Sequence, residues 1–421
     1  MTRKLLSAAA VMVAVFFTGS LVAQAADVTF GGQLRPRYEV RQQSDANQNG
    51  EFITMRTRLN TNVKVDDNTS AFLQFQMNST WGGGGFNPSA ASDASTEVGL
   101  HQAYFTLKNL FGAPVTAKIG RQEIILDGHR LFGNTGWTSG SQSHDAAVFT
   151  HSHDNMTLLY GWSKVFEAPD AFDETNVEAH IGWLNMKGLM GGNSSTSVYL
   201  VYIDNDSAHP ALGQVQFWTI GARHAGGSGA IDYRGEFYFQ SGESGGTGAG
   251  GIDQDISAFM FGGRVGYKAA GVGMKPKITL WADYLSGSDT TTTDFEAFNT
   301  LFDTGHKFYG LQDIILSQGV VGGNHAGLLD IAVKLAMHPT AKITAKADFH
   351  HFQTAEDKLS GAVPTLNDDL GQEIDLTLIY KYSANVKWST GVSVFFNDDN
   401  FPINASTEDP SWFYIMADLK F

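Results

Sequence analysis

The chain has 421 residues, 47 of them glycine and none cysteine, and a formal net charge of −15 at pH 7. The lack of cysteine excludes a fold held by disulfides and a c-type haem bound through a Cys-x-x-Cys-His site. The negative charge argues against nucleic acid or another polyanionic surface as a partner.

The first 25 residues have the pattern of a secretory signal peptide. Arg3 and Lys4 form a basic start, residues 5–22 are mostly apolar, and residues 23–25 (Ala-Gln-Ala) provide the small residues of a cleavage site. We therefore expect a mature chain that begins at Ala26, whose net charge changes from −15 to −17 because Arg3 and Lys4 are lost. An uncleaved anchor is the alternative, but no charged stop-transfer segment follows the apolar run.

The first expected hairpin, residues 27–65, alternates apolar and polar positions with the two-residue period of a strand. One face carries side chains such as Val28, Phe30 and Leu34. The other face carries five arginines and a lysine, namely Arg35, Arg37, Arg41, Arg56, Arg58 and Lys64. Such alternation fits a soluble sandwich with an apolar core, or an outer-membrane barrel with lipid outside and water inside.

Similar segments recur along the chain, separated by short and long connections in turn. The expected strands are 28–41, 53–65, 70–80, 97–108, 115–126, 144–150, 156–163, 177–186, 196–204, 214–224, 230–240, 255–268, 275–285, 326–338, 340–352, 371–382, 386–397 and 411–421. Most are close to the roughly 9–11 residues that a tilted strand needs to cross a bilayer. The sequence therefore predicts an all-β fold, a single closed antiparallel barrel of about 18 strands spanning residues 26–421.

An even number of strands leaves both chain ends on the periplasmic side, with short turns there and long loops outside. Residues 306–318 could form another strand, but that strand would reverse the side of the C-terminus. We therefore expect residues 286–325 to be a long extracellular loop that folds inward over the pore, because long ordered loops are usually functional.

The last expected strand supports the membrane barrel over a soluble sandwich. Residues 411–421 place Phe413, Ile415, Leu419 and the terminal Phe421 on one face, opposite Asp418 and other polar positions. A final strand of this kind, ending in an aromatic residue, resembles the pattern by which outer-membrane barrels are recognised for assembly. The sequence thus favours the outer membrane, with lipid and lipopolysaccharide as surroundings.

Several motifs resemble the alginate export family of outer-membrane barrels. They are Arg35-Pro36-Arg37-Tyr38-Glu39, Arg56-Thr57-Arg58-Leu59, Gly120-Arg121-Gln122, Gly128-His129-Arg130-Leu131 with Trp137 and Asp145, His306-Lys307-Phe308-Tyr309-Gly310-Leu311-Gln312-Asp313, and Gly371-Gln372-Glu373-Ile374-Asp375-Leu376. The resemblance spans the mature chain. It implies a monomeric barrel of about 18 strands with constricting charges in the lumen and loops that cover its ends.

The candidate pore-lining residues are charged residues of the expected lumenal face. They are Arg35, Arg37, Arg56, Arg58, Lys118, Arg234, Glu373 and Asp375, and the resemblance adds Arg121, Arg130 and Asp145. The lumen is expected to be basic on its N-terminal arc and mixed to acidic beyond it. Guanidinium groups on rigid strands suit repeated binding and release of an anion. The alternative is that these arginines only pair with wall carboxylates such as Glu39.

These features predict a channel for an anionic solute, either a polyuronate, a sugar acid or another small organic anion. A barrel acting as a sheath or adhesin for a partner protein is the alternative. No paired wall serine and histidine stands out as a hydrolase site, so we expect no enzyme activity. No cofactor is expected, although acidic outer loops such as 170–174, 289–303 and 398–409 suit divalent cations such as Ca²⁺, which would bridge lipopolysaccharide.

Overall fold

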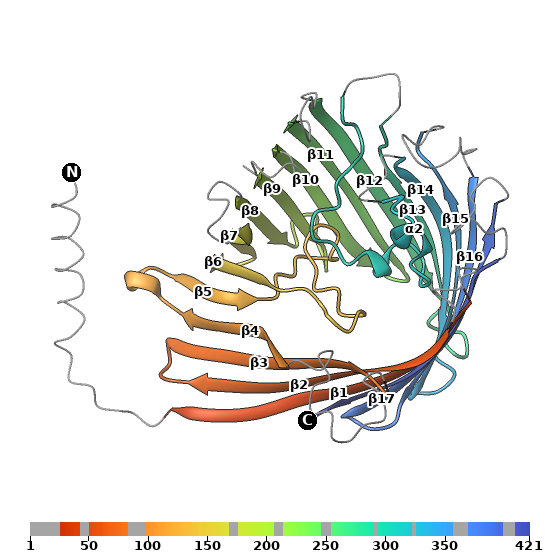
Figure 1. The fold of residues 1–421 in the computed structure, drawn as a ribbon, viewed down its shortest axis with the longest axis horizontal. Coiled ribbons are helices and arrows are strands. Elements are labelled where there is room, and N and C mark those ends of the chain that lie inside the picture. Colours follow the sequence, from red (N-terminus) through yellow and green to blue (C-terminus); the bar gives the residue numbers. More distant parts are fainter. Residues whose placement is uncertain are drawn as a thin grey trace.

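A computed structural model describes residues 26–42, 50–82, 98–167, 176–205, 214–245, 254–288, 294–321, 326–356, 369–398 and 409–421. Within them, eighteen strands form one antiparallel sheet (Figure 1). They are β1 (Asp27–Gln42), β2 (Gly50–Lys64), β3 (Thr69–Thr80), β4 (Val98–Leu107), β5 (Val115–Gln122), β6 (His144–His153), β7 (Met156–Glu167), β8 (Asn176–Lys187), β9 (Ser195–Asn205), β10 (Val215–Ser228), β11 (Ile231–Ser244), β12 (Gln254–Lys268), β13 (Lys277–Leu285), β14 (Leu328–Met337), β15 (Ile343–Gln353), β16 (Asp369–Lys381), β17 (Val386–Asn397) and β18 (Ser411–Lys420). The predicted fold class is confirmed.

The first and last strands close the sheet into a barrel. β1 pairs with β2 on one edge and with β18 on the other, in a register that sets Leu34 opposite Leu419. The ladder continues to the final residue, since the Gly32 amide donates to the Phe421 carbonyl at 2.8 Å. A Cβ at Gly32 would lie 2.6 Å from the backbone carbonyl oxygen of Arg58 on β2 and 2.6 Å from the Phe421 ring, so this seam requires glycine. Closure leaves no unpaired strand edge to face lipid.

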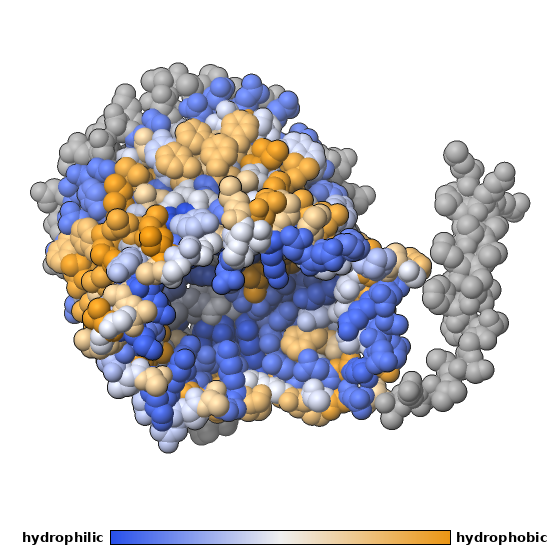
Figure 2. All heavy atoms as spheres, turned by 180° about the vertical axis from the view of Figure 1, so that it is seen from behind, coloured by the Kyte–Doolittle hydropathy of each residue, from blue (hydrophilic) through white to orange (hydrophobic). Residues whose placement is uncertain are grey.

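The two faces of the wall have the polarity expected of a membrane barrel. On β1, Phe30 is 72% exposed on the outside, whereas Arg35 and Arg37 are each 6% exposed on the inside. Figure 2 shows apolar side chains on the outer surface around a hollow with a largely hydrophilic wall. Among the described helices, none is long and apolar enough to span a membrane.

Two connections fold into the lumen. One joins β5 to β6 (residues 123–143). The other joins β13 to β14 (residues 286–327, described except 289–293 and 322–325) and contains the short helices η2 (Gly305–Lys307) and α2 (Ile314–Ser317). A bridge between Phe132 and Phe302 joins the two connections. The described residues of the β13–β14 connection therefore share the lumen with the β5–β6 connection, whose inward path the sequence did not indicate.

An apolar core lies inside the barrel between these loops and part of the wall. Phe132, Tyr309 and Ile314 from the loops have no exposed surface, and they belong to one buried cluster with wall residues Ile181 and Met260. The sequence identified charged residues on the lumenal face but did not indicate that inward positions of this arc are apolar. The inward positions there are apolar because they pack against protein rather than water.

Strand boundaries differ from the predicted ones near this core. β5 ends at Gln122 rather than at residue 126, because Ile124 and Leu126 leave the sheet and become 96% buried in the lumen core, with 4% exposure each. β10 extends to Ser228, so only residues 229 and 230 separate it from β11. A one-turn helix, η1 (Leu110–Gly112), fills the short connection between β4 and β5.

Candidate functional site

Three arginines of the first hairpin converge on one turn of the β5–β6 connection. We name Arg35, Arg37 and Arg56 the arginine triad, and residues 136–138 the 136–138 turn. The Nη1 atom of Arg35 donates to the Gly136 carbonyl at 2.6 Å, and its Nη2 atom donates to the carbonyls of residues 137 and 138 at 2.9 and 3.1 Å. Arg56 Nη1 donates to the carbonyls of 136 and 138 as well, each at 3.1 Å.

Other nitrogens of the triad are also engaged. Arg37 donates from Nη1 to the carbonyl of residue 137 at 2.9 Å and from Nε to Glu39 at 2.7 Å. Arg56 donates from Nε and Nη2 to the side-chain oxygen of Gln33 at 3.2 and 3.0 Å. The triad is therefore lumenal, as predicted, and its charge is directed at backbone carbonyls of a loop.

Trp137 locks the same turn from its side chain. The Arg37 guanidinium lies 4.4 Å from the centre of the Trp137 ring, and the His306 ring stacks on it at 4.5 Å with an interplanar angle of 8°. Trp412 and Tyr414 of β18 meet the ring edge-on at 5.7 and 5.0 Å. Since Arg37 and His306 contact the ring in this way, Trp137 joins the two inward loops to the wall rather than offering a flat surface to a solute.

Arg58, next to the triad, belongs to a network around Glu123. Arg58 donates to Gln76 at 2.7 Å and lies 3.7 Å from the Glu123 carboxylate, which also bonds His101 at 2.9 Å and Asn134 at 2.9 Å. Burial acts to raise the pKa of Glu123, but these hydrogen bonds and charges lower it overall. The loop therefore supplies the negative charge that partly offsets the basic arc.

A second charged cluster lies on the far side of the lumen, around Arg130. Arg130 is 2% exposed, donates from Nε to Glu236 at 3.1 Å, and forms a further ion pair with Asp283. Its guanidinium also lies 3.6 Å from the centre of the Phe308 ring. Burial acts to lower the pKa of Arg130, but its carboxylate partners raise it well above the ordinary value. Arg130 therefore holds the two loops and β11–β13 together rather than facing open solvent.

Glu373 and Asp375 lie on the predicted lumenal face but beneath the β13–β14 connection. Glu373 has no exposed surface and accepts hydrogen bonds from the backbone amides of Leu311 and Gln312 at 2.6 and 2.9 Å. Asp375 accepts a hydrogen bond from the Ser393 hydroxyl. Glu373 therefore anchors the loop, Asp375 bonds the neighbouring strand β17, and neither buried carboxyl group is open to a passing solute in this structure.

Arg121 and Asp145 do not line the lumen, which corrects the expectation drawn from the motif. They form a two-bond ion pair at 2.8 and 2.7 Å, with side chains 47% and 54% exposed. Strand alternation places them on the outer face, because their neighbours Gln122 and Ala146 are buried on the inner one. Lys118 keeps its predicted side, half-buried with Nζ 4.0 Å from the centre of the Tyr104 ring.

The acidic residues that the sequence placed in outer loops include some that lie outside the described residues and one, Asp303, that is buried. Residues 170–174, 289 and 408 lie outside the described residues, so cation bridging to lipopolysaccharide stays a prediction. Asp303 is not at the outer surface, because its Oδ2 atom is buried without a hydrogen-bond partner inside the lumen. Burial raises the pKa of Asp303 to about 7.

A cavity of about 470 Å³ lies between the triad and the short-turn end of the barrel, and we name it the basic vestibule. By the rule for outer-membrane barrels the short turns face the periplasm. Its charged lining residues are Arg35, Arg56, Lys307, Lys346, Lys387 and Lys420, with only Asp348 and Asp418 of opposite sign. The loop residues His129, Trp137 and Lys307 form its other side.

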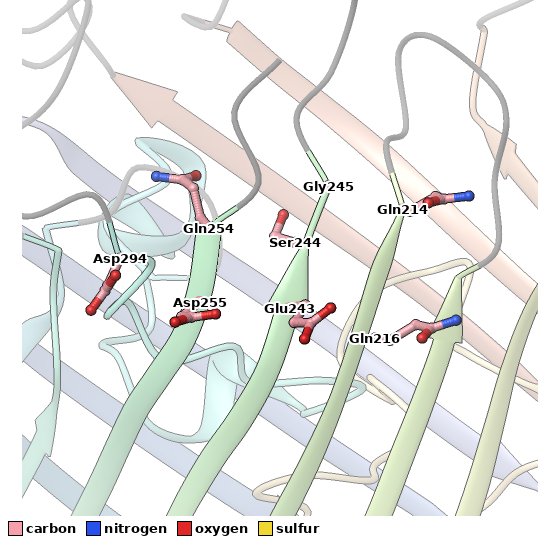
Figure 3. Close-up of a pocket in the computed structure, with 8 residues that line it drawn as sticks. All are labelled: Gln214, Gln216, Glu243, Ser244, Gly245, Gln254, Asp255 and Asp294. Atoms are coloured by element: carbon pink, nitrogen blue, oxygen red, sulfur yellow. The ribbon is translucent and has the colours of Figure 1, made fainter.

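The long-loop end carries a hollow of opposite polarity. A pocket of about 430 Å³ lies across the ends of β10, β11 and β12. Figure 3 shows the carboxylates of Glu243, Asp255 and Asp294 around it. Gln214 and Gln216 line it from β10 and the residue before it. By strand alternation Glu243 and Asp255 share the outer face with the exposed Phe239 and Phe259, so this acidic pocket lies on the outside of the barrel wall and not in the lumen.

Trp137, His306 and Lys307 were not among the predicted site residues, although they stand in motifs quoted above. Glu123 was also missed. Sequence alternation identifies residues of strands, whereas these four belong to loops whose position inside the lumen is set by tertiary contacts. A tryptophan within a polar loop, as at position 137, was the one available signal.

Comparisons with known proteins agree with this architecture. A family model described as alginate export matches residues 26–408. Among solved structures, OccK5 (OpdH) of Pseudomonas aeruginosa is 14% identical over 94% of this chain and 98% of that chain, with a TM-score of 0.59. OccK2 (OpdF) of the same organism, solved with glucuronate, is 10% identical over 94% and 98%, with a TM-score of 0.56. A BenF-like porin from Pseudomonas fluorescens Pf-5 is 13% identical over 94% and 98%, with a TM-score of 0.57. No curated protein sequence matches the chain.

Proposed function

Because this chain belongs to the alginate export family of outer-membrane β-barrels, we propose that its porin-like lumen passes a small sugar acid through the basic vestibule. The observation that carries this proposal is the charge of that cavity, whose wall has six basic side chains and two carboxylates. Its volume of about 470 Å³ falls within the range of small-molecule sites. A solute with a carboxylate is attracted to such a site.

The inward loops favour a small solute over a long polymer. Both connections fill part of the lumen with a packed core, and the 136–138 turn lies across the triad. An extended polyuronate would have to displace these contacts along its whole length, whereas the vestibule has room for a single sugar acid. The similarity to OccK2, solved with glucuronate, supports this class of solute.

The proposal is tested by ion selectivity of the purified barrel in planar bilayers. We expect the reversal potential in a salt gradient to show anion preference, and we expect Lys346→Gln with Lys387→Gln to reduce it. These lysines line the vestibule without hydrogen-bonding the turn. Lys342→Gln, in the exposed β14–β15 turn, is the matched control. Cation preference of the wild type, or an unchanged reversal potential in the double variant, would contradict the proposal.

A further inference from the structure

A second group of cations lies on the wall formed by β10, β11 and β12, away from the triad. Arg234 and Arg264 are directly opposite each other in the β11–β12 register. Arg223 of β10 faces the same region, since its Nε atom lies 3.8 Å from where a Cβ of Gly128 would be. Lys307 of η2 donates to the Gly128 carbonyl at 3.4 Å, which places it beside Arg223. The ring of the next residue, Phe308, lies 6.1 Å from the ring of Trp281, which the guanidinium groups of Arg234 and Arg264 also approach.

The carboxylates nearby do not balance these charges evenly. Arg234 has Glu236 at 3.3 Å and Asp283 at 3.6 Å, and both carboxylates also bind Arg130. Arg264 has no such partner among the residues that the structure describes, and its buried Nε atom has no hydrogen bond. The guanidinium carbon of Arg264 lies 5.8 Å from the centre of the Trp281 ring.

Lys307 is in a similar position. Its recorded bond is to a neutral carbonyl, and in the described part of the chain no carboxylate pairs with it. Burial lowers the pKa of Lys307, and the charges of Arg234, Arg264 and Arg223 lower it further. Like charges held this close repel one another unless an anion lies between them.

This arrangement contrasts with the triad. The arginines of the triad donate to the 136–138 turn, to Glu39 and to Gln33, so an anion reaching them has to replace existing acceptors. Lys307, in contrast, lines the basic vestibule and is exposed. An anion in the vestibule therefore meets a positive charge at Lys307 that no described carboxylate pairs with, whereas the triad residues that line the same cavity already donate to acceptors.

We propose that Arg264 and Lys307 form a second anion-binding position for the carboxylate of a sugar acid, on a different arc of the lumen from the triad. The inference rests on the proposed function and extends it, because it gives the solute a binding position that does not require release of the 136–138 turn. Arg234, whose guanidinium lies 4.2 Å from the centre of the Trp281 ring, adds positive charge behind this position.

The test uses the full barrel in planar bilayers with D-glucuronate as the probe and glucose as the neutral comparison. Block of the chloride current by glucuronate gives an apparent dissociation constant. We expect Lys307→Gln and Arg264→Gln each to raise this constant about tenfold, the size of one charge-assisted hydrogen bond. Lys307→Arg should restore block, and Lys342→Gln, an equal loss of charge in an exposed turn, should leave it unchanged.

The outcomes separate this inference from the proposed function. If the wild type prefers anions but Lys307→Gln and Arg264→Gln block like Lys342→Gln, the second position is wrong and the anion channel stands. If glucose blocks as well as glucuronate does, charge recognition at this position is wrong. If the wild type shows no anion preference, the proposed function fails and the inference with it. Should Arg264→Gln not insert, Lys307→Gln decides alone, because it changes a loop and leaves the wall intact.

Discussion

Removal of the Trp137 side chain should loosen the 136–138 turn. The substitution leaves the backbone carbonyl groups, to which the triad donates, chemically unchanged. Trp137→Ala deletes a ring held between Arg37 at 4.4 Å and His306 at 4.5 Å, and supported edge-on by Tyr414 at 5.0 Å. The cation–π contact, the aromatic contacts and the lost packing of a half-buried ring together come to about 2–3 kcal/mol. At 1.4 kcal/mol per tenfold, the population with a displaced turn should rise about 30- to 150-fold.

Single-channel recording measures this change directly. We expect Trp137→Ala to show more frequent and larger openings than the wild type at the same voltage. Trp218→Ala is the matched control, because Trp218 lies on the outer face of β10, is 49% exposed and stacks on Tyr202 at 4.5 Å. If the two variants give the same conductance and opening statistics, Trp137 does not restrain the turn and the reasoning is refuted.

Two further predictions concern the β13–β14 connection. Glu373→Ala leaves the amides of Leu311 and Gln312 without their acceptor, a cost of about 2–4 kcal/mol, so trypsin should cut after Lys307 at least tenfold faster in the unheated barrel. Asp369→Ala on the same strand should match the wild-type rate, and an equal rate in both variants would show that Glu373 is not the anchor. The pKa of Asp303 is about 7 in the folded barrel and about 3.9 in an unfolded chain. The protonated side chain therefore contributes stability that is fully present below about pH 4 and is lost as the pH rises through 7. Channel openings should therefore be more frequent at pH 8 than at pH 5, and Asp303→Asn should remove the difference; a pH response that survives in Asp303→Asn would contradict this assignment.

The fold could be predicted from local alternation because successive side chains of a strand point to opposite faces of the sheet. One face meets lipid and the other meets the lumen, so residue type alternates with the same period. In the first hairpin, Phe30 faces outward and Arg35, Arg37 and Arg56 face inward, as their positions in the pattern indicate. The same alternation also argues against a lumenal Arg121, which was predicted only from the motif resemblance. Lys118 and Arg121 are three residues apart, so a regular strand cannot turn both inward, and the structure keeps Lys118 inside and Arg121 outside.

Loop positions could not be predicted in this way, because a loop has no period and its path depends on what it meets. The sequence analysis placed Asp303 in an acidic outer loop, whereas its buried Oδ2 atom lies in the lumen. Glu373 and Asp375 were assigned to the correct face of β16, yet a loop amide pair covers Glu373. Facing the lumen and facing water are different properties once a loop enters the barrel.

The sequence by itself determined the barrel: eighteen alternating segments, an even count, and a basic first hairpin turned toward the lumen. Only the tertiary structure decided what the arginines of that hairpin contact. Arg35, Arg37 and Arg56 donate to the carbonyls of a turn about a hundred residues away along the chain, and no local pattern encodes such a contact. Strand polarity follows from the two solvents on either side of a sheet, whereas the occupancy of the lumen follows from the packing of two loops against each other.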